Sequence, residues 1–323
     1  MNGDHIIYLV ALPTLLVFVL VEYIYRKRSS RYKKLSLNII ASNLFLGLLD
    51  RLFFVFFSVL HYEAMKWLQE YSFFNLKWHH VLSTIALFTL VDFIWYYYHR
   101  IVHQKPILWA LHSTHHQTGE YSLTLGFRLS FITQILRAIC WMPLIIIGFE
   151  PIHILSVVFF QHFYQFFIHT EIWTFPKWTR SILVTPQSHK LHHSNAKEHL
   201  NANYGGVLIL WDKLFNTYKN PYNKVIKLEG SLSHEKFTHP LNGLFLPLIN
   251  FFRVKVGKNL SKGLQLNESL SNNYRLMNLF LVFFIPAIAF ILFGGQIKIA
   301  WLIVLSFGLI IMILSTLYFS FKK

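Results

Sequence analysis

Long apolar stretches separated by short polar segments dominate this chain. Seven of them are long enough to be helices, over residues 6–25, 38–60, 81–98, 129–149, 152–168, 276–293 and 299–318. A helix needs about 20 mostly apolar residues to cross a bilayer, and several of these stretches reach that length. A tight Gly148–Phe149–Glu150–Pro151 turn joins the fourth stretch to the fifth. The pattern therefore predicts an all-α, multi-pass membrane protein.

The same pattern divides the chain into four regions. We expect an N-terminal transmembrane region at residues 1–80, a central region at 81–240, a cytoplasmic connector at 241–275 and a C-terminal transmembrane hairpin at 276–323. Basic residues follow the first apolar stretch at positions 26–34. Because positively charged loops tend to face the cytoplasm, this loop sets the orientation. Counting spans from it places both polar parts of the central region on the cytoplasmic side.

Composition supports a membrane protein and argues against a nucleic-acid partner. Charged residues make up 14% of the chain, whereas a soluble domain usually has about 25%. The net charge of +16 comes from basic residues in short loops beside apolar stretches, which suits anionic lipid head groups. No DNA- or RNA-binding motif accompanies this charge. The single Cys140 excludes a disulfide within the chain.

Histidines carry the main functional signal. Eight of the 18 histidines form three clusters: His99 and His103; His112, His115 and His116; and His189, His192 and His193. Residues three and four apart share one face of a helix, so each cluster can direct two or three imidazoles at one point. Neutral imidazole binds iron, zinc, copper and nickel. Eight imidazoles exceed the needs of one tetrahedral zinc ion, so the pattern predicts two metal ions.

Roles for the histidine clusters that involve no metal enzyme agree less well with the sequence. A single H-x-x-x-H usually marks ordinary surface histidines, but three clusters on one predicted membrane face favour a metal site. The zinc-metalloprotease motif H-E-x-x-H is absent, and carboxylates are scarce beside the clusters, unlike in glutamate-rich di-iron bundles. A transporter would carry its polar residues at mid-span. Here the histidines cluster at and beyond one predicted membrane face, which argues against a transporter. A non-catalytic metal-binding membrane protein stays open as an alternative.

Five stretches, in this order along the chain, contain or follow the clusters: DFIWYYYHRIVH (92–103), LWALHSTHHQTGEYSLTLGFRLS (108–130), YQFFIHTE (164–171), TPQSHKLHH (185–193) and NYGGVLILWDKLFNTY (203–218). Together they resemble the membrane fatty acid hydroxylase/sterol desaturase superfamily, and within it the alkylglycerol monooxygenase type. The flanking spans match that superfamily only in kind. Gln104 follows His103 where the alkylglycerol-type pattern usually has a glutamate.

The resemblance implies a cytoplasmic, non-haem centre of two Fe ions that uses O2 and two electrons to oxidise a lipid C–H bond. Glyceryl ethers are the leading substrate, and a desaturase with the same centre is an alternative that product analysis would separate. The chain has no nicotinamide or flavin fingerprint, so electrons must come from an external reductant, with tetrahydrobiopterin as one candidate. The resemblance implies these metal ligands: His99, His103, His112, His115, His116, His169, His189, His192 and His193.

Carboxylates near the clusters suggest supporting roles. Asp92 precedes His99 by two helical turns and shares its face. A metal-ligating histidine usually donates its other N–H to a carboxylate or carbonyl, so we expect Asp92 to orient a ligand. Glu171 and Asp212 are weaker candidates of the same kind. Asp50 and Arg51 interrupt the second apolar stretch, either as a pair that bridges helices or at a lipid head group.

Overall fold

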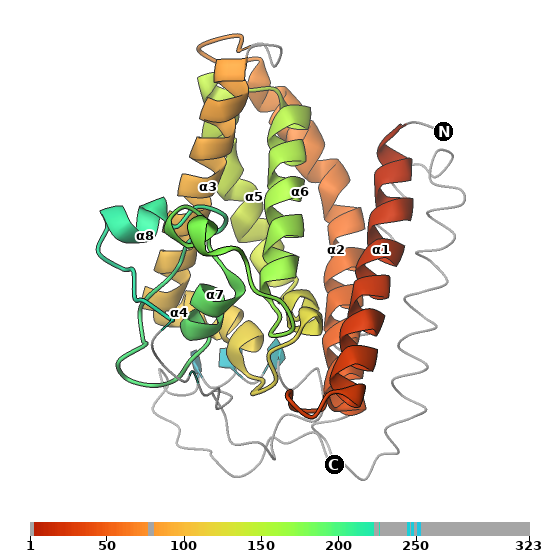
Figure 1. Cartoon of the computed structure of the whole chain (residues 1–323). Helices are drawn as coiled ribbons and strands as arrows, with labels where there is room; N and C mark the ends of the chain where they lie inside the picture. Colours follow the sequence, from red (N-terminus) through yellow and green to blue (C-terminus); the bar gives the residue numbers. More distant parts are fainter. Residues whose placement is uncertain are drawn as a thin grey trace.

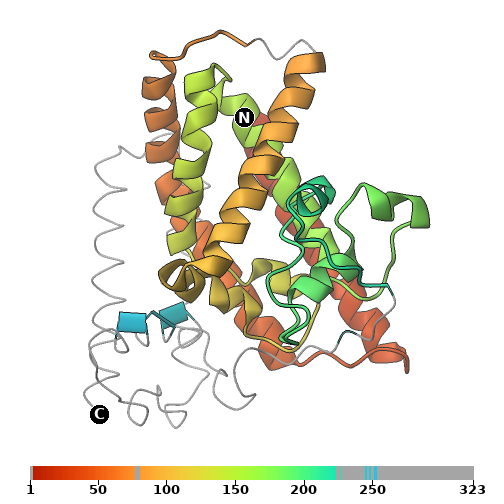
Figure 2. The same cartoon turned by 90° about the vertical axis from the view of Figure 1, so that its left-hand side faces the viewer.

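The computed structural model describes residues 3–76, 81–222 and a few positions between 226 and 252. Five long helices form a bundle (Figures 1 and 2). They are α1 (Gly3–Arg28), α2 (Leu37–Gln69), α3 (Val81–Gln104), α5 (Ile132–Ile147) and α6 (Pro151–Ile168). Within the described part of the chain there is no strand, only two isolated bridges. The expected hairpin at 276–323 and most of the connector at 241–275 lie outside the described residues.

The five long helices coincide with the first five apolar stretches. Two of them, α3 and α6, are long and apolar enough to cross a membrane, and α5 is a shorter apolar helix. Two helices continue well past the C-terminal end of their predicted stretches. α2 continues past Leu60 to Gln69, and α3 continues past Tyr98 to Gln104. The extension of α3 places His99 and His103 on its last turns.

Short elements gather beside the C-terminal halves of α3 and α6 (Figure 1). They are α4 (Pro106–His112), η1 (Ser113–His116), η2 (Leu123–Phe127), η3 (Lys177–Ser181), α7 (Pro186–His192) and α8 (Leu210–Leu214). Lys105 interrupts the helical path between α3 and α4 with extended dihedral angles, as expected for a residue before proline. Thr185 and Ser188 form a capping box at the start of α7, and Pro186 occupies its first turn.

The apolar core lies between α2, α3, α5 and α6, on the side of the bundle away from the short elements. Its buried members include Met65, Leu87, Val91, Trp141 and Ile154. Close van der Waals packing of such side chains holds the helices together, in lipid as in water. The core therefore fixes α3 and α6, whose opposite ends lead to His99, His103 and His169.

The turn between α5 and α6 depends on Gly148. Its φ of +122° is one that other residues rarely adopt, and a Cβ there would collide with the backbone carbonyl of Phe74. The loop before α3 packs directly on this turn, because Phe73 N donates to Ile146 O at 2.8 Å and Leu76 N donates to Gly148 O at 3.1 Å. The tight turn predicted from the sequence is confirmed, and it aligns α6 against α3.

Candidate metal centre

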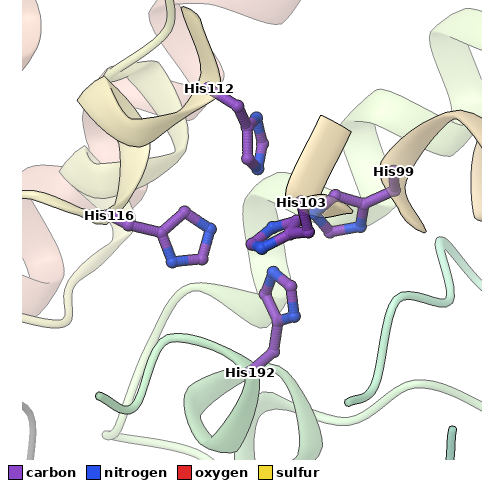
Figure 3. A group of neighbouring side chains, drawn as sticks. All are labelled: His99, His103, His112, His116 and His192. Atoms are coloured by element: carbon purple, nitrogen blue, oxygen red, sulfur yellow. The ribbon is translucent and has the colours of Figure 1, made fainter. Parts of the chain in front are cut away.

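All nine histidines named above converge in two groups. The first group consists of His99, His103, His112, His116 and His192, and the second of His115, His169, His189 and His193. Within each group the potential ligand nitrogens all lie within 4.8 Å of one another. Figure 3 shows the rings of the first group arranged around a common point. Four separate elements supply the first group, so only the folded protein assembles it.

The structure divides two of the three sequence clusters between the groups, which corrects the expectation that each cluster serves one point. Histidines four apart stay together, as His112 and His116 do in the first group and His189 and His193 in the second. His115, by contrast, belongs to the second group, and His192 belongs to the first. Neighbouring residues differ by about 100–120° around a helix axis, so His115 and His116 point in different directions.

The two groups are immediate neighbours. The rings of His116 and His193, one from each group, stack with their centroids 4.2 Å apart. The ring centroids of His115 and His193 are 4.6 Å apart within the second group. Two ions held by these groups would therefore lie side by side rather than at separate sites.

Backbone carbonyls orient the first group. The Nδ1 atoms of His99 and His192 lie 2.9 Å from Tyr204 O and Ala202 O, respectively. Because a carbonyl can only accept, Nδ1 carries the proton and Nε2 presents a lone pair. The Nε2 atoms of all five histidines in this group are buried and have no hydrogen-bond partner among the described residues. Leaving buried acceptors unpaired is costly, and a cation at their centre would satisfy all five.

The second group shows the same need for a cation. The Nδ1 atoms of His115 and His169 face Arg128 O at 3.3 Å and Gln165 O at 2.6 Å, yet their Nε2 atoms are only 3.1 Å apart. Two lone pairs at this distance repel unless a cation lies between them. His189 Nε2 is 2.9 Å from His169 Nε2. Spacings of about 3 Å are those of neighbouring nitrogens on a metal with bonds of about 2.0–2.1 Å. Both groups fit metal ions.

Asp92 supports the first group indirectly, whereas the sequence suggested that its carboxylate would accept from a ligand. His99 donates to Tyr204 O instead. The buried Asp92 carboxylate accepts four hydrogen bonds, from Val207 N at 2.8 Å, Leu208 N at 3.0 Å, Trp211 Nε1 at 3.0 Å and Gln161 Nε2 at 2.9 Å. Asp92 therefore holds the loop that carries the Tyr204 carbonyl.

Asp212 holds the same loop from its other side. Its carboxylate accepts from Tyr204 N at 2.8 Å, Gly205 N at 2.8 Å and Thr217 Oγ1 at 2.7 Å. A Cβ on Gly206 would lie 2.9 Å from Asp92 Oδ1 and 2.7 Å from the Trp95 ring, so only glycine allows this close approach. Sequence reasoning missed the role of Tyr204, although the glycine pair that follows it signals a tightly packed loop.

A charge network around the buried Arg26 supports the second group and was not expected from the sequence. Arg26 of α1 donates to Tyr121 O at 2.7 Å, and the Tyr121 ring lies 5.6 Å from the His193 ring, measured between centroids. Glu171 forms ion pairs with Arg26 at 3.3 Å and with Lys190. Glu171 thus joins α1 to α7, and no hydrogen bond links it to a histidine in the described structure.

Burial dominates the protonation behaviour of the histidines outside the long helices. It lowers the pKa of His169 to about 4 and holds the pKa of His189 and His193 well below the usual 6.5, with further lowering by neighbouring imidazoles. These rings stay neutral near pH 7, which is the state that binds metal.

This burial predicts acid-sensitive stability of the metal-free chain. Below pH 6.5 the unfolded histidines bind protons that the folded ones do not, so the free energy of unfolding falls as the pH drops from about 6.5 towards 4. Melting of chelator-treated protein, followed by circular dichroism between about pH 7.5 and 5, should show a steadily falling midpoint. A midpoint independent of pH over this range would contradict the neutral buried rings.

Comparisons with known proteins agree with this geometry. Residues 84–217 match the family model for fatty acid hydroxylase. Alkylglycerol monooxygenase from Homo sapiens is 35% identical over 198 residues, which cover 61% of this chain and 42% of that protein. The same enzyme from Xenopus tropicalis is 34% identical over 174 residues, covering 54% of this chain and 37% of that protein. The ornithine lipid hydroxylase OlsE from Rhizobium tropici is 27% identical over 146 residues, covering 45% of this chain and 44% of that protein.

The chain spans less than half the length of these relatives. No solved structure matches it. The matched region nevertheless contains every histidine of both groups, the carboxylate of Asp92 and the Tyr204 loop. The match to the fatty acid hydroxylase family therefore covers the part of the chain that holds both histidine groups.

Proposed function

We propose that this chain is a membrane-bound di-iron oxygenase that uses O2 to hydroxylate a C–H bond of a lipid. The observation that carries the proposal is the pair of adjacent imidazole groups at the end of apolar helices. The match of residues 84–217 to the fatty acid hydroxylase family supports the reaction class. Non-haem iron with nitrogen ligands suits oxygen chemistry, and nine imidazoles suffice for two ions.

Two iron ions, when bound, would supply the reduction of O2 that breaks an unactivated C–H bond. The chain's own part is to hold and orient the ligands and to exclude bulk water. Carbonyls of Tyr204, Ala202, Arg128 and Gln165 fix the rings by accepting from Nδ1. Seven of the nine histidines are buried and the other two are half-buried, so water reaches the centre poorly.

The exposed surface of the helices supports the proposed membrane placement. Large apolar side chains such as Leu82, Ile85, Ile139 and Phe160 are exposed on α3, α5 and α6. Such surfaces are unfavourable in water and suit the lipid phase. We propose a multi-pass arrangement with the histidine groups on the cytoplasmic side, where the basic residues after α1 also lie. A lipid chain would then reach the centre from the adjoining leaflet.

Glyceryl ethers are the proposed substrates, because relatives of this chain are alkylglycerol monooxygenases. Hydroxylation of the carbon beside the ether oxygen gives a hemiacetal, which separates into a fatty aldehyde and a glycerol. One oxygen atom of O2 enters the aldehyde, and the other leaves as water after two electrons and two protons are taken up. We propose an external electron donor, such as tetrahydrobiopterin. The ornithine lipid hydroxylase relative makes acyl-chain hydroxylation the second candidate.

Incubation of iron-loaded protein with an alkylglycerol, reduced pterin and ¹⁸O2 should yield a fatty aldehyde that carries the label. The aldehyde is reduced to its alcohol as it forms, so that the label is retained for mass spectrometry, and metal-free protein is the control. If a labelled hydroxyacyl lipid forms in cell extracts instead, the proposed oxygenase activity stands, but the substrate is an acyl chain and not a glyceryl ether. A new double bond without label would indicate a desaturase. Absence of any O2-dependent product would favour a non-catalytic metal-binding protein.

A further inference from the structure

A buried charge pair lies inside the bundle, outside both histidine groups. Arg137 of α5 is 5% exposed and faces Asp50 of α2, which is 1% exposed. Arg137 Nη2 is 3.9 Å from Asp50 Oδ1, too far for a hydrogen bond. Arg137 Nε and Nη2 and Asp50 Oδ1 have no hydrogen-bond partner in the described structure. Unsatisfied buried charges of this kind are costly and therefore require an explanation.

The pair is held in place by other contacts. Asp50 Oδ2 accepts from Gln134 Nε2 at 2.7 Å and forms an ion pair with Arg51 Nη2 at 3.4 Å. One carboxylate oxygen of Asp50 is thus fixed and the other stays open toward Arg137. Asp50 bridges α2 and α5, as one of the two roles suggested by the sequence requires. Oδ1 of Asp50 and two nitrogens of Arg137 nevertheless remain without hydrogen bonds among the described residues.

Helix α6 carries further unpaired polar atoms. His162 and Gln165 lie one turn apart, and each has a buried Nε2 atom without a partner among the described residues. Helix α6 packs against α5, which carries Arg137. The four side chains of Asp50, Arg137, His162 and Gln165, here called the polar cluster, combine open donors with an open acceptor.

The polar cluster adjoins the first histidine group. The His162 ring packs edge-on against Trp95 with centroids 5.3 Å apart, and Trp95 lies 5.9 Å from the His99 ring. Helix α5, which carries Arg137, also packs against α4, which carries His112. A small group bound by Arg137 would therefore lie next to the proposed metal centre.

We propose that the polar cluster binds the hydroxyl groups of a neutral polyol lipid and so holds the neighbouring carbon beside the first histidine group. A hydroxyl can accept from the Arg137 guanidinium and donate to Asp50 Oδ1 at the same time, which satisfies both. A phosphate dianion has no proton for Asp50 and would be repelled by it. This inference rests on the proposed lipid substrate and names the part of it that is recognised.

Equilibrium binding of two labelled lipids tests the proposal. The first is 1-O-hexadecylglycerol, and the second is its derivative with both hydroxyls methylated, which keeps the chain and the ether oxygen. Metal-loaded full-length protein is used without O2 or reductant, so that no turnover occurs. Because hydrogen bonds to charged groups are stronger than those between neutral groups, the free diol should bind about tenfold or more tightly.

The double variant Asp50→Asn/Arg137→Gln removes both charges without leaving one unpaired, and it should abolish this preference. Lys66→Gln, in an exposed pair on the same helix, is the matched control and should keep it. If the double variant does not fold, Gln165→Leu should weaken the preference on its own. Metal content reports whether each variant retains the centre.

Equal affinity of the wild-type protein for the two lipids would overturn the proposal, as would an unchanged preference in the double variant. Either result would mean that the cluster holds water or serves packing alone. Because binding is measured without turnover, a missing preference for the diol would contradict this inference and leave the proposed lipid oxidation untouched. A protein that prefers the diol but never oxidises it would instead contradict the proposed function.

Discussion

Replacement of His189 by alanine should lower the metal content of the purified chain from about two ions to about one and reduce lipid oxidation below detection. His189 Nε2 lies 2.9 Å from His169 Nε2 and 3.3 Å from His193 Nε2, so it is central to the second group. Loss of a residue that only orients a ligand typically costs about 10–100-fold, and loss of a ligand itself should cost more. Metal analysis and product formation are measured on the same samples.

Two further variants make this result specific. His103→Ala should deplete the first group in the same way, because the two groups are separate sets of ligands. His153→Ala, at the opposite end of α6, should leave both metal content and activity near wild type. One ion per chain that His189→Ala does not change would exclude the two-ion centre. Zinc in place of iron would not, since zinc competes well at nitrogen ligands.

Asp92→Asn should lower the metal affinity of the first group by about 10–100-fold while the second group keeps its ion. The amide replaces one acceptor oxygen with an NH2 group, and that group would face donors such as Val207 N or Trp211 Nε1. The loop should then shift, and the Tyr204 carbonyl would lose its hydrogen bond to His99. Competition with a chelator of known affinity measures the change for each ion separately.

Asp212→Asn should have a similar effect, because Asp212 holds Tyr204 N and Gly205 N of the same loop. Glu63→Gln, an exposed carboxylate on α2, is the matched control and should bind metal normally. A fall in melting temperature with unchanged affinity for both ions would return Asp92 to a packing role. Selective loss at the first group is the result that a general loss of stability would not produce.

Local patterns were enough to locate the helices and the candidate ligands. Apolar stretches mark helices because each backbone group must be paired inside the segment when side chains are buried or face lipid. That rule depends on neighbouring residues alone, and α1, α2, α3, α5 and α6 coincide with five of the stretches it selects. The histidine clusters were equally local, since spacings of three and four residues are visible in the sequence. His169 was predicted as a ligand because the stretch around it resembles a stretch of the family.

The supporting contacts were beyond local patterns. The sequence placed Asp92 on the face of His99, which is a statement about one helix. In the structure, the Tyr204 loop, more than 100 residues later in the chain, contacts both side chains. Its Tyr204 carbonyl accepts from His99, and its Val207 N donates to Asp92. A carbonyl is present at every residue and carries no signal in the sequence. Which carbonyl meets a given imidazole is therefore decided only when distant segments pack.

The sequence by itself determined that this chain has apolar helices and nine histidines suited to bind metal. Only the tertiary structure decided how those histidines divide into groups of five and four, and that Arg137 faces Asp50 with open hydrogen-bonding atoms. Helical periodicity sets which residues share a face of one helix. It does not set how faces from different helices meet, because that depends on the packing of side chains across the whole bundle.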